Sequence, residues 1–358
     1  HSISRLWKQS SGLMARSVTQ NAGDHGEHYI TRDKKEYWAM FYSAAGGGVL
    51  IALMALFKTY LGSIIDDKVW KGIAEGLNYG LGFMVIFMLH FTVATKQPAM
   101  TAARFAEAVE KTPQGKTVNM KLAQLLVDVF RSQSIAVLGN VLIAMGLAAL
   151  IAFGYQYKTG EPLMNADQIA YQLHSIDPFA GTLWFAAIAG VWLFCSGIIS
   201  GYFDNRSNYL NMRMRLTQHP LLKKLMSEKT RVKFANYMHE NYGSLIGNLC
   251  FGMLLGITGV VGYLTHLPLD IRHVAFSSAN VGYIAVSGHF TYSLLLQCIA
   301  FVLLIGLVNL IVSFSLTLWV ALRSLNAEID SWWLIWHGVC QIVKKRPLSL
   351  FLPVQLDK

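Results

Sequence analysis

Few residues in this sequence combine types and spacing that could support chemistry. The densest group lies in the loop HLPLDIRHV at residues 266–274, which places Asp270, Arg272 and His273 within four positions. A carboxylate and a guanidinium two residues apart can pair and stabilise a turn. The same base beside an imidazole can instead bind an anion or contact a partner, so the sequence leaves both interpretations open.

Among the polar residues that interrupt the apolar runs, Asn140, Asn248 and His90 are candidates for a structural or binding role. An asparagine in hydrocarbon needs a hydrogen-bond partner, so Asn140 and Asn248 are expected to bond to a neighbouring helix or backbone, or alternatively to bind a ligand. His90 lies near the end of its run, where either a packed histidine or a proton carrier would fit. No carboxylate lies near the middle of a run, which disfavours ion-coupled transport.

Sequence signatures of soluble enzymes are absent. The chain contains no Walker loop, no GxSxG and no HExxH. Its four cysteines have neither the spacing of a metal site nor that of a disulfide framework. We therefore predict no metal, no cofactor and no catalytic residue in this chain.

The composition of the chain indicates an all-α, polytopic membrane protein, whose helices would position these residues. Of the 358 residues, 54% are hydrophobic and only 14% are charged, whereas soluble domains carry about a quarter charged residues. Six apolar runs reach the roughly 20 residues that a transmembrane helix needs: 38–61, 73–95, 135–157, 178–203, 245–264 and 290–322. A seventh stretch, 274–288, is short and is expected to form a re-entrant or interfacial helix rather than a full span.

The basic residues predict the orientation of these spans. If residues 1–37, 96–134, 204–241 and 323–358 lie on one side, that side holds 25 of the 30 Lys and Arg residues. Positive residues stay in the cytoplasm, so both termini are predicted to be cytoplasmic. We expect a cytosolic helical lead-in at 1–37, cut from a longer N-terminal region, and a six-helix membrane domain at 38–325. Its basic cytosolic loops would be 96–134 and 204–241.

Two of the runs share their first and last residues. GNVLIAMGLAALIAFGY at 139–155 and GNLCFGMLLGITGVVGY at 247–263 lie 108 positions apart, and GGVLIA at 47–52 resembles the start of the first. Each of the three runs is followed by an outer loop, a second run and a basic segment. We therefore predict three tandem helical hairpins inserted in the same direction.

The C-terminal segment 326–358 combines aromatic and basic residues. Trp332, Trp333 and Trp336 precede Lys344, Lys345 and Arg346 in SWWLIWHGVCQIVKKRP. This pattern is typical of an amphipathic helix lying on the inner leaflet, so anionic lipid is an expected partner.

Five stretches are particular to this chain: GEHYITRDKKEY (26–37), ATKQPAMTAA (94–103), SGYFDNRSNY (200–209), GNLCFGMLLGITGVVG (247–262) and LPLDIRHV (267–274). Together they resemble the membrane portion of a Gram-negative bacterial family described as site-specific recombinase. The resemblance covers nearly the whole chain and implies a bacterial inner-membrane protein. Within these stretches Lys96, Gln97, Asp204 and Asn205 are further candidates for a structural or binding role.

Three functions follow as hypotheses. The first is a non-enzymatic scaffold of the cell envelope that binds membrane or cytosolic proteins. The second is a protein that transports or handles a lipid or small molecule, and the third is membrane-tethered DNA recombination, as the family description implies. The longest segment outside the predicted spans, 96–134, is too short to fold alone as a catalytic domain. We therefore expect neither DNA cleavage nor nucleic-acid binding by this chain.

Overall fold

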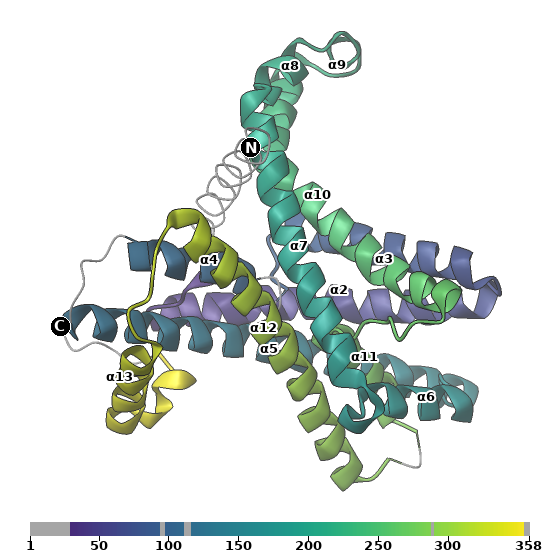
Figure 1. The fold of residues 1–358 in the computed structure, drawn as a ribbon. Helices are drawn as coiled ribbons and strands as arrows, with labels where there is room; N and C mark the ends of the chain where they lie inside the picture. The colour runs from purple at the N-terminus through teal and green to yellow at the C-terminus, as the bar shows by residue number, and fades with distance from the viewer. Residues whose placement is uncertain (1–28, 94–96, 111–115, 288–289, 354–358) are drawn as a thin grey trace.

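The protein is all-α, as predicted. The computed structural model describes residues 29–93, 97–110, 116–287 and 290–353, and none of these residues lies in a β-strand. The long helices are α2 (Lys34–Ile64), α3 (Lys68–Met88), α5 (Lys116–Thr159), α7 (Thr182–Tyr209), α10 (Glu228–Thr265) and α12 (Tyr292–Leu325) (Figure 1). The shorter helices are α4 (Gln97–Glu110), α6 (Ala166–Ile176), α8 (Met212–Gln218), α9 (Pro220–Leu225), α11 (Val274–Ala285) and α13 (Trp332–Lys345). Two 3₁₀ turns complete the described elements, η3 (Pro178–Ala180) and η4 (Pro347–Leu350).

Five helices among the described residues are long and apolar enough to cross a membrane. These segments are Lys34–Ile64, Asn119–Thr159, Thr182–Tyr209, Glu228–Thr265 and Tyr292–Leu325. Only 28% to 56% of their apolar windows is buried within the protein, so these helices leave much apolar surface exposed. The remaining long helix, α3, carries Lys68, Lys71 and Glu75 in its first half and is not among the five.

The run predicted at 73–95 does not form one continuous helix. α3 ends at Met88, and His90 has a left-handed backbone conformation with φ of 59°. The Phe91 N–H then donates to the Ile86 carbonyl oxygen and closes the helix end. The predicted span is thus too long, because hydropathy does not register a backbone reversal.

α2 and α5 pack side by side and run in the same direction. A Cβ at Gly48 would lie 2.9 Å from the Asn140 carbonyl oxygen, and a Cβ at Gly139 would lie 2.8 Å from the Ala44 Cβ. Both distances are shorter than ordinary contacts, so these glycines allow the two backbones to approach. The two related motifs GGVLIA and GNVLIA therefore face each other at this crossing.

α10 packs against both α3 and α7, antiparallel to each. Gly252 and Gly256 of α10 lie directly against the backbone of Gly80 and Gly76 in α3. On the α7 side, a Cβ at Gly247 would lie 3.0 Å from the Ser196 carbonyl oxygen. Glycine-to-backbone contact of this kind is how membrane helices gain close packing in the absence of a hydrophobic driving force.

The helices pair differently from the predicted tandem hairpins. α2 does pack against α3, but α5 packs mainly against α2 and α11, and α7 packs mainly against α10 and α12. Along the chain, α6 lies between α5 and α7, and α11 lies between α10 and α12. The prediction of three equivalent hairpins is therefore wrong for the second and third, because glycine-lined faces decide the pairing and sequence order does not.

The predicted short helix at 274–288 is α11, which lies inside the protein. Ten of its twelve residues are buried. Its Tyr283 hydroxyl donates to the Ala52 carbonyl oxygen of α2 at 2.7 Å, and its Gly282 rests on Met145 of α5. At about 1.5 Å per residue, α11 is about 18 Å long and too short to cross a bilayer core.

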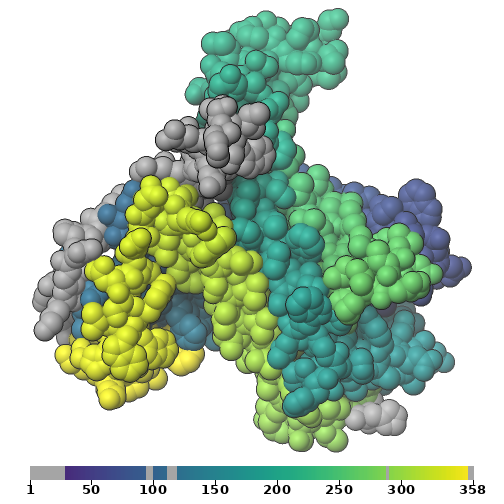
Figure 2. All heavy atoms as spheres, in the orientation of Figure 1, coloured from purple at the N-terminus to yellow at the C-terminus, as the bar shows by residue number. Residues whose placement is uncertain are grey.

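Two regions extend from the long helices. The first is an arm made of the end of α7, α8, α9 and the start of α10, which projects away from the other helices (Figures 1 and 2). The second is a cluster in which α4, the start of α5, the end of α12 and α13 share an apolar core around Phe105 and Ile335.

Candidate binding cavity

The predicted site residues do not converge on one place. Asp270, Arg272 and His273 line a cavity of about 600 Å³. Asn140 and Asn248 are buried in helix contacts elsewhere. The cavity is therefore the candidate site, and the asparagines belong to the packing.

Each of these two asparagines donates hydrogen bonds to backbone. The Asn140 amide donates to the carbonyl oxygens of Ala44 at 2.5 Å and Thr92 at 2.9 Å, which joins α5 to α2 and to the segment after α3. The Asn248 amide donates to the Ser244 carbonyl oxygen at 2.8 Å, one turn earlier in α10.

A third buried asparagine, Asn309 of α12, was not singled out from the sequence. Its oxygen accepts the Val274 N–H at 3.1 Å, and its amide donates to the carbonyl oxygens of Ala186 at 2.7 Å and Arg272 at 3.0 Å. It thereby fixes the start of α11 and the preceding loop against α7 and α12. The available signal was its position as the single asparagine in the apolar run 290–322.

Asp204 and Asn205 lie at the base of the arm. The Asp204 carboxylate accepts the Gly243 N–H at 2.8 Å and so links α7 to α10. Asn205 follows it in α7 and is half-buried.

His90 and Gln97 lie near the turn that follows α3. His90 is exposed in that turn, and its carbonyl oxygen accepts the Ser43 hydroxyl at 3.0 Å. Gln97 begins α4, and Lys96 lies outside the described residues. His90 does not line the cavity.

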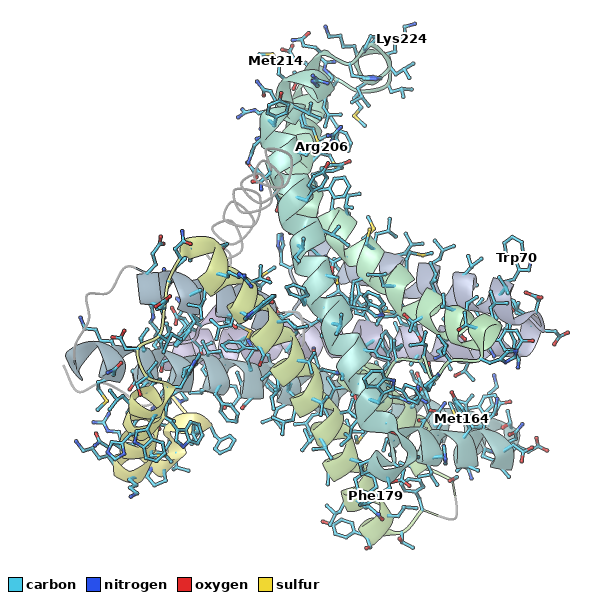
Figure 3. All side chains as sticks on the ribbon, in the orientation of Figure 1. Trp70, Met164, Phe179, Arg206, Met214 and Lys224 are labelled. Carbon is cyan, nitrogen blue, oxygen red and sulfur yellow. The ribbon has the colours of Figure 1, made fainter. Side chains whose placement is uncertain are left out.

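The cavity forms where three helix ends, one short helix and one loop meet. Its walls are the end of α2, the first half of α3, the end of α10, α6, and the loop that leads into α11. Figure 3 shows these elements together, with Met164 at the start of α6 and Trp70 at the outer end of α3. They lie at the end of the helices opposite the basic arm.

An ion pair and several aromatic rings line the cavity. The Lys58 ammonium of α2 is 3.6 Å from the Glu75 carboxylate of α3 and 5.7 Å from the centroid of the Tyr79 ring. The His273 ring is buried near Phe276, with 5.7 Å between their centroids. Burial lowers the pKa of His273 to about 3, so its imidazole is neutral at physiological pH.

A second ion pair shapes the loop before α11. The Arg272 guanidinium donates to the Asp270 carboxylate at 2.6 Å and to the Ser175 carbonyl oxygen at 2.8 Å. The Arg272 backbone N–H donates to the Phe185 carbonyl oxygen at 3.2 Å. These bonds tie the loop to α6 and α7, which is the turn-stabilising geometry that one of the two sequence interpretations describes.

Two further lysines line the cavity near the start of α3. The Lys68 ammonium lies 4.3 Å from the centroid of the Tyr263 ring, and a Cβ at Gly62 would lie 3.0 Å from the Lys71 ammonium. Among the described residues, neither lysine has a carboxylate within ion-pair distance. Their charges are therefore available to an anion in the cavity.

α6 forms one wall because its sequence encodes a stable helix start. The Asn165 side chain accepts the Gln168 N–H, and the Gln168 side chain accepts the Asn165 N–H, each at 2.9 Å. This reciprocal capping box fixes the first turn of a helix that is only eleven residues long. Asp167 in that turn also lines the cavity.

More basic than acidic side chains line the cavity. Four bases line it, Lys58, Lys68, Lys71 and Arg272, against three acids, Glu75, Asp167 and Asp270. Lys58 and Arg272 form ion pairs with Glu75 and Asp270, so the remaining charges that line the cavity are those of Lys68, Lys71 and Asp167. The described residues contain no group of three His, Cys, Asp or Glu side chains that could hold a metal ion. The arrangement suits an organic or inorganic anion.

Sequence reasoning identified only part of this site. Lys68, Lys71 and Asp167 went unnoticed because they lie in short loops and helix starts far apart in the chain. The capping-box pattern NADQ at 165–168 was a readable signal for α6.

Comparison with known proteins gives one match. A family model described as "Site-specific recombinase" matches residues 1–353. No curated protein and no solved structure matches the chain.

Proposed function

This chain belongs to the site-specific recombinase family, and we propose that it binds a small anionic group in the cavity between α2, α3, α6, α10 and α11. The ligand would carry a phosphate or carboxylate, either on a small solute or on the headgroup of a lipid. The chain would thus act as a ligand-handling protein of the bacterial inner membrane.

One observation carries the proposal. Only five bases lie outside the segments assigned to the cytoplasm: Lys58, Lys68, Lys71, Lys158 and Arg272. All of these except Lys158 line this single cavity. Chance placement would scatter so few bases over the outer loops, whereas an anion site requires them in one place.

The cavity also favours ligand binding over a scaffold. A scaffold needs closely packed helices and exposed faces, and most of this protein meets that description. A hollow of about 600 Å³ has the size of a small-molecule site. Its mixture of aromatic rings, amide groups and paired charges matches the few polar anchors that orient a ligand in such sites.

The proposed orientation places the cavity on the outer face. α2, α5 and α10 run in one direction and α3, α7 and α12 in the other, as six alternating crossings require. α3 would be the sixth crossing, tolerated because its Glu75 pairs with Lys58 of α2. Both termini would then be cytoplasmic, in line with the distribution of basic residues.

The test compares matched lysine variants in purified full-length chain. Lys68→Gln/Lys71→Gln removes the two unpaired cations of the cavity, and Lys158→Gln removes an exposed outer base that does not line it. Thermal stability is measured in detergent with sodium phosphate, with dihexanoyl phosphatidylglycerol or with sodium chloride, all at one ionic strength.

We expect stabilisation of the wild type and of Lys158→Gln by one of the two phosphate probes, and its loss in the double variant. Hydrogen bonds to a charged group are worth about 1.5–3 kcal/mol, so losing even one lowers affinity about tenfold or more. A response to inorganic phosphate identifies a solute site, and a response to the lipid alone identifies a headgroup site. Equal responses in all three proteins would contradict the proposal.

The family description supports DNA recombination as a second candidate function. In this chain the feature that favours it is the arm, whose tip carries Arg213, Arg215, Lys223 and Lys224; Figure 3 labels Lys224 and Met214 there. The distinguishing assay incubates purified chain with duplex DNA and looks for a covalent protein–DNA adduct. We expect none, and an adduct lost on changing one Tyr or Ser would establish recombination chemistry instead.

A further inference from the structure

The C-terminal helix α13 presents three tryptophans on one exposed side. Trp332, Trp333 and Trp336 are 51%, 72% and 60% exposed. Their spacing of one and four positions places them along one stripe of the helix, which we call the tryptophan face. Three tryptophans that are each more than half exposed on one side of a helix are unusual for a surface that meets only water.

The opposite side of α13 is fixed to the protein. Ile335 is fully buried in the apolar cluster shared with α4, α5 and α12. A Cβ at Gly338 would lie 2.8 Å from the Ala123 Cβ of α5, so the two helices are in close contact. At the edge of the tryptophan face, the Trp332 ring stacks on Phe105 of α4 with 6.4 Å between centroids. The helix is therefore held in one orientation, and the tryptophan face points outward.

Positive charge follows the tryptophan face directly. Lys344, Lys345 and Arg346 close α13 and are exposed, and residues 331–353 contain no acid. Beyond them, η4 and the following turn expose Leu348, Phe351 and Leu352. Apolar, aromatic and basic groups without acids form the chemistry that matches an anionic lipid surface.

The position of α13 fits the cytoplasmic boundary of the membrane. Only six residues separate the end of α12 at Leu325 from the start of α13 at Trp332. Near that end of α12, the Arg323 guanidinium lies 5.6 Å from the centroid of the Trp319 ring, an aromatic–basic pairing that is common at membrane interfaces. In Figures 1 and 2, α13 lies beside the start of α5, at the end of the bundle opposite α6.

We propose that the tryptophan face of α13 inserts into the headgroup region of the cytoplasmic leaflet and that Lys344, Lys345 and Arg346 bind the phosphates of anionic lipids there. The indole rings have an apolar body and one N–H donor, which suits the boundary between hydrocarbon and water. Each of the three bases near an anionic surface favours binding by about fivefold. The site is independent of the cavity, which lies at the other end of the helices.

The test places a nitroxide label on each side of α13. Full-length chain in which the four native cysteines are replaced by alanine receives Trp333→Cys or, as the control on another side, Gln341→Cys. Labelled proteins are placed in nanodiscs of phosphatidylcholine alone or with phosphatidylglycerol. Electron paramagnetic resonance then measures label collisions with oxygen, which concentrates in lipid, and with a water-soluble nickel chelate.

We expect the label at 333 to collide mainly with oxygen and the label at 341 mainly with nickel. The oxygen preference at 333 should grow with phosphatidylglycerol and lose that growth in Lys344→Gln/Lys345→Gln/Arg346→Gln. Equal nickel access at 333 and 341 would overturn the proposal. So would dipolar broadening between labels at 333 of two copies, which would mean that a second chain covers the face.

A second measurement leaves the native cysteines and helix in place. Brominated lipids quench tryptophan fluorescence at their own depth, so wild type is compared with Trp333→Phe/Trp336→Phe in nanodiscs. We expect the fraction quenched by lipids brominated near the headgroup to fall in the double variant. An unchanged fraction would contradict insertion of this face.

Discussion

Replacing Gly252 with alanine should weaken the central helix contact of the fold. A Cβ at Gly252 would overlap the backbone nitrogen and Cα of Gly80, which are atoms that cannot move aside as a side chain does. Restoring ordinary contact requires α10 and α3 to move apart, and a gap of only about 0.5–1 Å already forfeits a quarter to a half of each close contact. Overpacking of this kind costs about 1–3 kcal/mol, offset by up to about 1 kcal/mol because alanine favours helix over glycine. We expect a net loss of about 1–2 kcal/mol.

The assay is SDS-induced unfolding in mixed micelles, followed by circular dichroism. Gly146→Ala is the matched control, because a Cβ at that position in α5 meets nothing within 4 Å. It should leave stability unchanged or raise it by up to about 1 kcal/mol. Gly247→Leu should be at least as harmful as Gly252→Ala, since a side chain there meets Ser196 and Ser200 of α7. If Gly252→Ala and Gly146→Ala shift the midpoint equally, the packing argument fails.

Three further predictions follow from topology, buried amides and titration. A cysteine probe at Asn165 should react with an impermeant reagent added outside cells while one at Gln114 should not, and the reverse pattern would contradict the proposed orientation. In the same unfolding assay, Asn140→Leu should destabilise the protein, because the Asn140 amide joins α5 to the backbone of two other segments. Such membrane bonds contribute on the order of 1 kcal/mol each, and unchanged stability in this variant would refute the assignment. The folded pKa of His273 lies near 3, below the unfolded value of about 6.5, so its contribution to stability is full above pH 6.5 and declines as pH falls toward 3. His273→Gln should therefore flatten the dependence of stability on pH between these values. An unaltered dependence would show that burial does not lower the pKa of this ring.

The helices themselves could be predicted from the sequence, because hydropathy and length determine whether a segment can cross a bilayer. Five of the six predicted runs correspond to helices that are long and apolar enough to do so. The remaining one, α3, carries Glu75 and two lysines that lower its apolar character, and it ends before the predicted boundary at a left-handed His90. A change in backbone direction does not alter the average hydropathy of a run, so hydropathy did not predict where this helix ends.

Helix pairing could not be predicted from order along the chain. The repeated Gly-Asn motifs did mark close approaches, since Gly139 and Gly247 both lie against neighbouring helices. The neighbours differ, however: Gly139 meets α2, whereas Gly247 meets α7. A glycine permits contact without specifying which helix fills the space, so similar motifs support unlike pairings.

The candidate site required tertiary structure for the same reason. Asp270 and Arg272 were recognisable as a local pair, and Lys58 and Glu75 could be expected to meet across the first hairpin. The role of Lys68 and Lys71 depends on the fold, because α6 and the loop before α11 enclose the same cavity that these two lysines line. Charged side chains from distant segments meet only in the folded protein, and their spacing along the sequence does not predict that they will meet.

The most direct test of the ligand-binding function is native mass spectrometry of the chain released from bacterial membranes in mild detergent. We predict that wild type and Lys158→Gln retain a co-purifying anion, either a phosphorylated or carboxylated solute or an anionic lipid, and that Lys68→Gln/Lys71→Gln does not. If all three proteins carry the same adducts at the same occupancy, or none carries any, the cavity is not an anion-binding site.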